Sequence, residues 1–109
     1  MPKNAGSYYY NEAAVMFNAH QDEAALTAAN KAITADPNQP MPYYIKGQEL
    51  LSKATVDAKG TIVAPPGCVD AYQKYLQLAP DGPQAASVKD VLTSLGQKVE
   101  TRYKAPGKK

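Results

Sequence analysis

The chain of 109 residues has little of the material from which metal and nucleophilic sites are built: one cysteine, one histidine and no tryptophan. The single cysteine, Cys68, excludes a disulfide within the chain and a cysteine-rich metal site. Charge is nearly balanced, with 12 basic and 10 acidic residues, and three of the basic residues lie in the last six positions. The body therefore lacks the basic stripe that a nucleic-acid interface needs. We expect no metal, no cofactor and no nucleic-acid partner.

Long apolar runs are missing as well. No stretch approaches the roughly 18 apolar residues of a membrane span, and residues 1–4 lead into a run of tyrosines, not into an apolar signal core. We therefore expect no membrane span and identify no targeting signal. Hydrophobic residues make up 44% of the chain and charged residues 20%. This balance is typical of a globular chain, and its length fits a single domain over residues 1–109.

What the chain does contain is a repeated pattern. An aromatic pair occurs twice, with its first members, Tyr9 and Tyr43, 34 residues apart, and a small residue follows each at the same distance. A helical stretch that ends in proline closes each unit, at Pro37 and at Pro80. Because these prolines are 43 residues apart, the second unit carries nine extra residues between its two helices.

The spacing of apolar residues predicts five helices. They are expected at about residues 8–19, 22–35, 41–53, 69–78 and 83–95. Ser7 is the predicted N-cap of the first helix, Pro83 the first-turn residue of the fifth, and Gly96 its C-terminal stop. Residues 54–64 carry β-branched side chains on both sides of a turn sequence, which predicts a small β-hairpin with Gly60 at positive φ.

The order of aromatic residue, small residue, small-residue helix and closing proline resembles the tetratricopeptide repeat over about residues 6–80. The pattern departs from the family at Glu12 and Lys46, where leucine is usual, at Ala29, where an aromatic residue is usual, and at Tyr75, where alanine is usual. The resemblance implies an all-α, tetratricopeptide-like α-solenoid of two repeats with a β-hairpin insertion. Its parts are repeat 1 at 6–37, repeat 2 at 40–80 with the insertion at 55–67, a capping helix at 83–95 and a tail at 97–109.

The resemblance also implies a place in a larger protein. Residues 2–5 look like the link that follows a closing proline in this family, so we expect the chain to be the C-terminal part of a longer bacterial array. Similar bacterial repeat proteins are often exported, which favours a periplasmic or extracellular protein over a cytoplasmic one.

In this family the first helix of each repeat lines a concave groove, and the resemblance carries that role to two sets of positions. The sets are uncharged and rich in aromatic side chains: Tyr10, Ala14, Phe17 and Asn18, then Met41, Tyr44, Gln48 and Leu51, with Ser7 and Ser52 at the ends. Tyrosine and phenylalanine give a large contact area at low entropic cost. The resemblance therefore implies a non-enzymatic module that binds a peptide or protein. The Lys and Asn that hold a partner's C-terminal carboxylate in some family members are replaced here by Tyr10 and Ala14.

Two alternatives to groove binding remain open. Tyr10 and Phe17 could instead pack beneath a preceding repeat. A chain with unpartnered ends could also be a structural element that assembles with other copies of itself, because each open end of a repeat stack exposes a helical face.

The remaining candidate residues favour plain structural roles. We expect His20 in a solvated turn, Cys68 packed in the core, and no catalytic pair formed by Glu12 and Glu49. Residues 98–103 alternate charged with apolar or β-branched side chains, which is the pattern of a half-buried strand. Such a strand would pair with the hairpin at 55–64, within one chain or between chains; the competing interpretation is a frayed tail.

Overall fold

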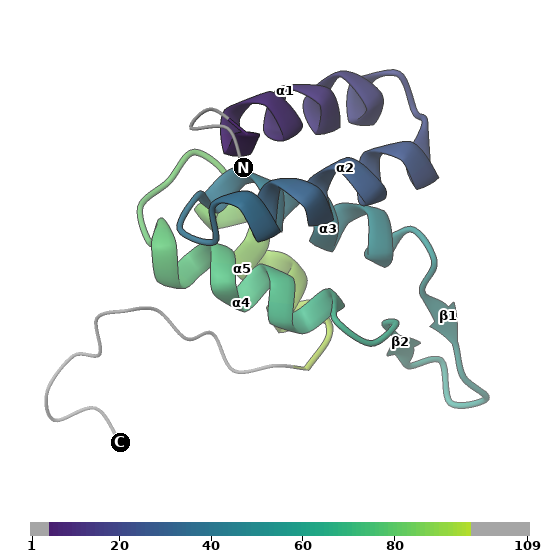
Figure 1. The fold of residues 1–109 in the computed structure, drawn as a ribbon. Coiled ribbons are helices and arrows are strands. Elements are labelled where there is room, and N and C mark those ends of the chain that lie inside the picture. The colour runs from purple at the N-terminus through teal and green to yellow at the C-terminus, as the bar shows by residue number, and fades with distance from the viewer. Residues whose placement is uncertain (1–4, 97–109) are drawn as a thin grey trace, which may run out of the picture.

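Five α-helices and one short β-hairpin make up the computed structural model, which describes residues 5–96 (Figure 1). The helices are α1 (Ala5–Asn18), α2 (Asp22–Ala35), α3 (Pro40–Leu51), α4 (Cys68–Leu78) and α5 (Ala85–Ser94). The hairpin lies between α3 and α4 and consists of β1 (Thr55–Val56) and β2 (Ile62–Val63), paired antiparallel. The prediction of a mostly helical chain with one small hairpin is confirmed.

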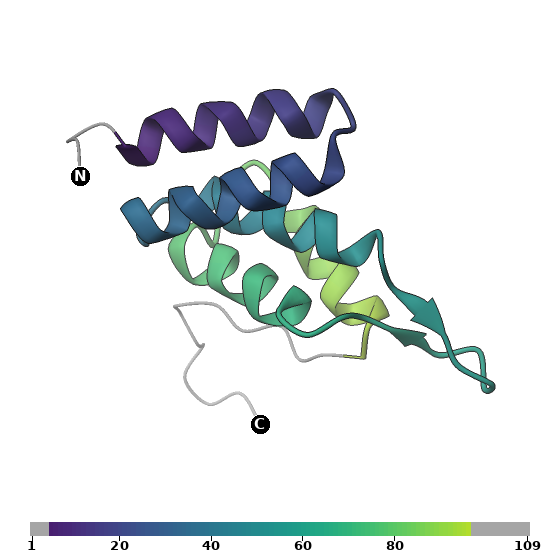
Figure 2. The same ribbon diagram turned by 45° about the vertical axis from the view of Figure 1, so that its right-hand side comes forward.

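Each helix packs against the next one along the chain. Contacts join α1 to α2, α2 to α3, α3 to α4 and α4 to α5, and a smaller contact joins α1 to α3. Figure 2 shows α1 and α2 running side by side in opposite directions, with α3 and α4 beyond them. The Tyr43 hydroxyl donates a hydrogen bond of 2.8 Å to the carbonyl oxygen of Pro37, which fixes the start of α3 to the turn after α2.

The beginning of α1 differs from the prediction. The helix starts at Ala5, so Ser7 lies inside it as an exposed residue and is not its N-cap. The reason is a tertiary contact, because Ala5 and Gly6 are buried and Gly6 lies against Asp36 at the end of α2. A Cβ atom on Gly6 would lie only 2.8 Å from the Cβ of Asp36. Packing against α2 therefore extends the helix by a turn that its local sequence did not indicate.

The turn from α1 to α2 ends the first helix with a residue in the left-handed conformation, and this residue is His20. His20 has a φ of 61°, and its N–H donates to the carbonyl of Phe17. The N–H of Gln21 donates to the carbonyl of Met16 at 2.8 Å. This pair of hydrogen bonds is the Schellman motif, in which glycine is the common residue at the position of His20. His20 is exposed, as predicted.

The fifth helix begins two residues later than predicted and ends one residue earlier, at Ser94. It starts at Ala85, and Pro83 belongs to the preceding turn. That turn is held by the Tyr75 hydroxyl, which accepts a hydrogen bond of 3.0 Å from the N–H of Gln84. Gly96 follows the helix with a φ of 76°, which confirms its role as the stop.

The core consists of two clusters with different side chains. The alanine cluster lies between α1, α2 and α3 and consists of Ala13, Ala25, Ala28 and Ala29, with Ile45. The aromatic cluster lies between α3, α4 and α5 and consists of larger side chains: Tyr43, Cys68, Tyr72, Tyr75, Leu76, Ala85, Val88 and Leu92. Tyr44 packs against both clusters.

The hairpin follows the predicted geometry and stands away from the helices (Figures 1 and 2). One oxygen of the Asp57 carboxylate accepts hydrogen bonds from the N–H groups of Lys59 and Thr61, and Gly60 has a φ of 82°. Thr55 lies opposite Val63, and Val56 opposite Ile62. All four strand residues are exposed. The strand predicted at 98–103 lies outside the described residues.

Candidate functional site

Seven of the eight predicted groove residues lie half-buried along α1 and α3. We call this surface the α1–α3 face and define it by Tyr10, Ala14 and Phe17 on α1 and by Met41, Tyr44, Gln48 and Leu51 on α3. Tyr10, Ala14, Phe17 and Tyr44 pack against the alanine cluster, whereas Met41 and Leu51 pack against the aromatic cluster. The eighth residue, Asn18, is exposed at the end of α1.

A chain of aromatic contacts crosses the α1–α3 face. The ring of Phe17 meets the ring of Tyr44 edge to face, with 6.4 Å between their centroids. Tyr44 in turn contacts Tyr75 of α4, with 6.0 Å between centroids. Burial, and after it the neighbouring Tyr75, raises the pKa of the Tyr44 hydroxyl. The face is therefore neutral, and its rings are positioned by contacts with three helices.

Gln48 gives the α1–α3 face a positioned polar group. Its side-chain oxygen accepts a hydrogen bond from the Tyr72 hydroxyl, which lies in the core beneath. Desolvation by burial raises the pKa of Tyr72, so this hydroxyl stays protonated and keeps donating. The Gln48 amide is therefore held in one orientation, with its NH₂ group as the donor that remains.

Cys68 of α4 and Gly47 of α3 lie at a close contact between these two helices. The Cys68 thiol is buried and lies 3.6 Å from the carbonyl oxygen of Gly47, to which it donates. Burial raises the pKa of Cys68, which disfavours the reactive thiolate. A Cβ atom on Gly47 would lie 2.7 Å from the ring of Tyr72, so only glycine fits at this contact. Cys68 is packed in the core, as predicted.

The structure buries a carboxyl group whose burial was not predicted, that of Glu49. It is 3% exposed and is the one buried charged side chain among residues 5–96. Burial, and after it a hydrogen bond and charge repulsion from Asp22 on α2, raises the pKa of Glu49 to about 7. Lys53 opposes this shift, while its ammonium binds the carboxylate of Glu23.

A signal for this burial is present in the sequence. Glu49 follows the buried Ile45 by four residues, so both lie on the same face of α3. The arrangement can hold one proton between the Glu49 and Asp22 carboxyl groups at the junction of α2 and α3. Glu12 lies on α1 and does not contribute to the shift in the pKa of Glu49.

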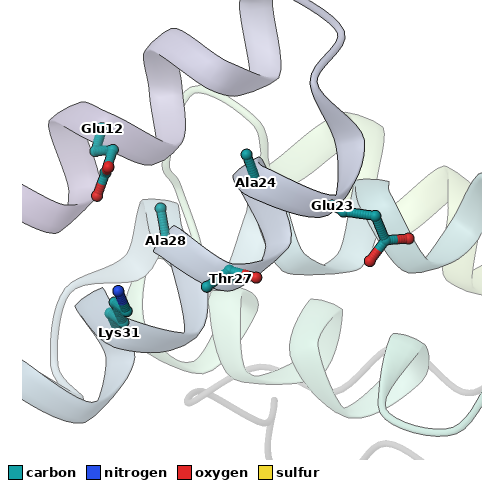
Figure 3. A pocket seen from close by; sticks show the side chains of 6 residues that line it. All are labelled: Glu12, Glu23, Ala24, Thr27, Ala28 and Lys31. Carbon is teal, nitrogen blue, oxygen red and sulfur yellow. The ribbon is translucent and has the colours of Figure 1, made fainter.

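A second surface lies on the outer side of α1 and α2. An open depression of about 270 Å³ is bordered by Glu12 of α1 and by residues of α2, among them Ala24, Thr27 and Lys31 (Figure 3). Tyr9 is half-buried and lies beside this surface. The Lys31 ammonium lies 5.6 Å from the centroid of the Tyr9 ring, so a cation–π contact holds Tyr9 at the edge of the core.

Comparisons of the chain with protein-family models, with curated proteins and with solved structures find no match. Among the helices of residues 5–96, none is both long enough and apolar enough to cross a membrane. Within the same residues, no three His, Cys, Asp or Glu side chains are grouped so that they could hold a metal ion. The functional assignment therefore depends on the geometry of the two surfaces.

Proposed function

We propose that the chain is a non-enzymatic interaction module, related in plan to tetratricopeptide repeats, that binds a peptide or protein segment along the α1–α3 face. The observation that carries this proposal is the half-burial of Tyr10, Phe17 and Tyr44. Each of these rings is anchored against the alanine cluster and still exposes part of its surface. Aromatic side chains fixed in this way make contacts with a partner without losing much conformational freedom.

The repeat plan is supported by two buried small residues, one in each unit. Ala13 and Gly47 occupy equivalent places in the two units and are both buried. Ala13 lets α1 approach α2, and Gly47 lets α3 approach the Tyr72 ring. In this plan α1–α2 and α3–α4 are the two repeats, the hairpin is an insertion in the second, and α5 is the cap.

The chemistry of the face limits the class of partner. Its residues carry no charge, and the one hydrogen-bonding group fixed from beneath is the Gln48 amide. An extended or helical segment with apolar or aromatic side chains and a free amide or carbonyl suits this surface. A segment recognised mainly through its charges does not. The proposal assigns no catalytic step to the chain.

A peptide-display selection on the immobilised chain tests the proposal. We expect apolar or aromatic peptides to be enriched, and the affinity of a selected peptide to fall about tenfold or more in Phe17→Ala and in Tyr10→Ala. Tyr8→Ala is the matched control, because Tyr8 is an exposed aromatic residue of the same helix outside the α1–α3 face. Equal binding by all three variants, or no selected peptide at all, would contradict the assignment.

A structural role through self-assembly is the second candidate function. The observation that favours it is the exposure of two large apolar side chains on the outer side of α1, Tyr8 at 63% and Val15 at 61%. An uncovered surface of this kind on an end helix is suited to contact with another protein.

A further inference from the structure

The outer side of α1 carries a stripe that no other part of the described chain covers. Tyr8, Glu12 and Val15 are spaced by four and three residues and so lie on one side of the helix. Tyr8 and Val15 are the two large apolar residues on the helices with most of their surface exposed. Glu12 lies between them and borders the depression described above.

The adjoining side of α2 carries small side chains around the depression. Ala24 and Thr27 line it and are exposed, whereas Ala28 lines it but is buried in the core. Small exposed residues let another helix approach closely. Figure 3 shows Glu23 and Lys31 at opposite ends of the depression, with Thr27 between them. We call this surface, together with the stripe on α1, the α1–α2 face.

The charges of the α1–α2 face are arranged symmetrically about Thr27. Glu23 precedes Thr27 by four residues and Lys31 follows it by four, so the two charges are about 12 Å apart along the helix. Within residues 5–96 the Lys31 ammonium contacts the Tyr9 ring and forms no ion pair. Glu23 binds Lys53 through one carboxylate oxygen, Oε2.

We propose that the α1–α2 face pairs with the same face of a second copy of this chain, with the two α2 helices antiparallel about a two-fold axis near Thr27. Such an axis places Glu23 of each copy opposite Lys31 of the other. The same ion pair then forms twice, as a self-complementary interface requires. The small residues of α2 meet at the centre, and Tyr8 and Val15 cover the margin.

Charge complementarity favours this occupant over head-to-tail stacking. The other end of the described chain is formed by α5, whose buried side carries Val88 and Leu92 and whose exposed side carries Ser87, Asp90 and Thr93. Apart from the small Ala86 the exposed residues of α5 are polar, so this side offers the α1–α2 face no large apolar side chain. Two helices of 14 residues give a face of about 20 Å by 20 Å, so a dimer would bury about 800 Å² in total, less than the roughly 1,200 Å² of stable specific interfaces. We therefore expect a dimer that dissociates at micromolar concentrations.

Sedimentation equilibrium tests the dimer over concentrations from about 1 µM to about 1 mM. The full chain should shift from monomer to dimer and no further. Glu23→Lys and Lys31→Glu should each raise the dissociation constant of the dimer about tenfold or more. Each variant places like charges opposite each other on both sides of the two-fold axis. An equimolar mixture of the two variants should associate at least as well as the original chain. In the mixed dimer, position 23 of each copy faces a residue of opposite charge at position 31 of the other.

Two controls separate this contact from a change within the monomer. Lys53→Gln removes the partner of Glu23 inside the chain and should leave dimerisation within about twofold of the original. Tyr8→Ser should weaken the dimer while peptide binding on the α1–α3 face stays unchanged, so this inference and the proposed function can fail separately. A chain that remains monomeric, a species larger than a dimer, or a mixture that associates no better than its components would overturn the proposal.

Discussion

The α1–α2 pair and the α3–α4 pair differ in the side chains that fill the space between their helices. Between α1 and α2 the buried side chains are alanines, among them Ala13, Ala25 and Ala29. Between α3 and α4, a glycine on one helix receives a tyrosine ring from the other, Gly47 against Tyr72. The α1–α2 pair is therefore held by the close approach of its backbones, and the α3–α4 pair by the packing of large rings.

This difference has a consequence for stability and for function. A buried tyrosine or phenylalanine removes about 150–250 Å² from water, several times what an alanine can bury. We therefore expect the α3–α4 pair to hold most of the stability and α1 to be the more easily displaced edge. Both proposed binding surfaces include α1. A bound partner would therefore stabilise the less stable half of the molecule.

The largest effect is expected for Tyr75→Ala. This residue is fully buried, its ring contacts Tyr44 and its hydroxyl holds the turn before α5. The free energy of unfolding should fall by about 3–5 kcal/mol. The matched change in the other cluster, Ala29→Gly, should cost only about 1 kcal/mol. Urea unfolding followed by circular dichroism checks both, and equal losses would remove the distinction between the two pairs.

Gly47→Leu should have the next largest effect. Even a Cβ atom at this position would lie 2.7 Å from the Tyr72 ring, so the larger side chain forces α3 and α4 apart. We expect a loss of about 1–3 kcal/mol in the free energy of unfolding. Ala86→Leu, on the exposed side of α5, is the control and should stay within about 0.5 kcal/mol of the original. An unchanged melting curve for Gly47→Leu would show that the close contact is absent.

The buried carboxyl at the junction of the two pairs should make stability depend on pH. The pKa of Glu49 rises from 4.5 to about 7 on folding, so between these values the folded chain binds more protons than the unfolded one. Stability should therefore fall as pH rises through this window and change no further from this group above about 7. At pH 8 we expect Glu49→Gln to be more stable than the original by about 1–2 kcal/mol, and at pH 4.5 to differ little.

Thermal unfolding at a series of pH values measures this difference. Glu12→Gln is the control, because Glu12 lies on α1 outside the contact between Glu49 and Asp22. A constant difference between Glu49→Gln and the original chain at all pH values would show that Glu49 does not hold its proton on folding.

The smallest effect concerns the stops of two helices, one in each half. His20 adopts a φ of 61°, at which a side chain is strained, whereas Gly96 fills the same role after α5 with a φ of 76°. His20→Gly should stabilise the chain by about 1 kcal/mol, and Gly96→Ala should destabilise it by a similar amount. The two melting temperatures should move in opposite directions; a shift in the same direction would contradict the strain at His20.

The features that the sequence predicted well are the ones with local causes. Apolar spacing and the closing residues Pro37 and Gly96 located the helices, and the turn with Gly60 located the hairpin. The early start of α1 and the burial of Glu49 depend on contacts with α2, which a linear pattern does not position.

The same limit applies to the two surfaces. The repeat spacing named eight groove residues, of which seven are half-buried along α1 and α3 and Asn18 is exposed. That they bind a partner stays a prediction. The α1–α2 face was not foreseen, because Tyr8 and Val15 look like ordinary helix residues until the structure shows that they are uncovered.

The most direct test of the proposed binding surface is an amide NMR titration of the chain with a peptide selected on it. We predict that the largest shifts will fall on both sides of the α1–α3 face, at Ala14 and Phe17 of α1 and at Gln48 of α3. The amides of β1, β2 and α5 should move little. Shifts confined to the hairpin or to the outer side of α2 would contradict the assignment of the α1–α3 face as the binding site.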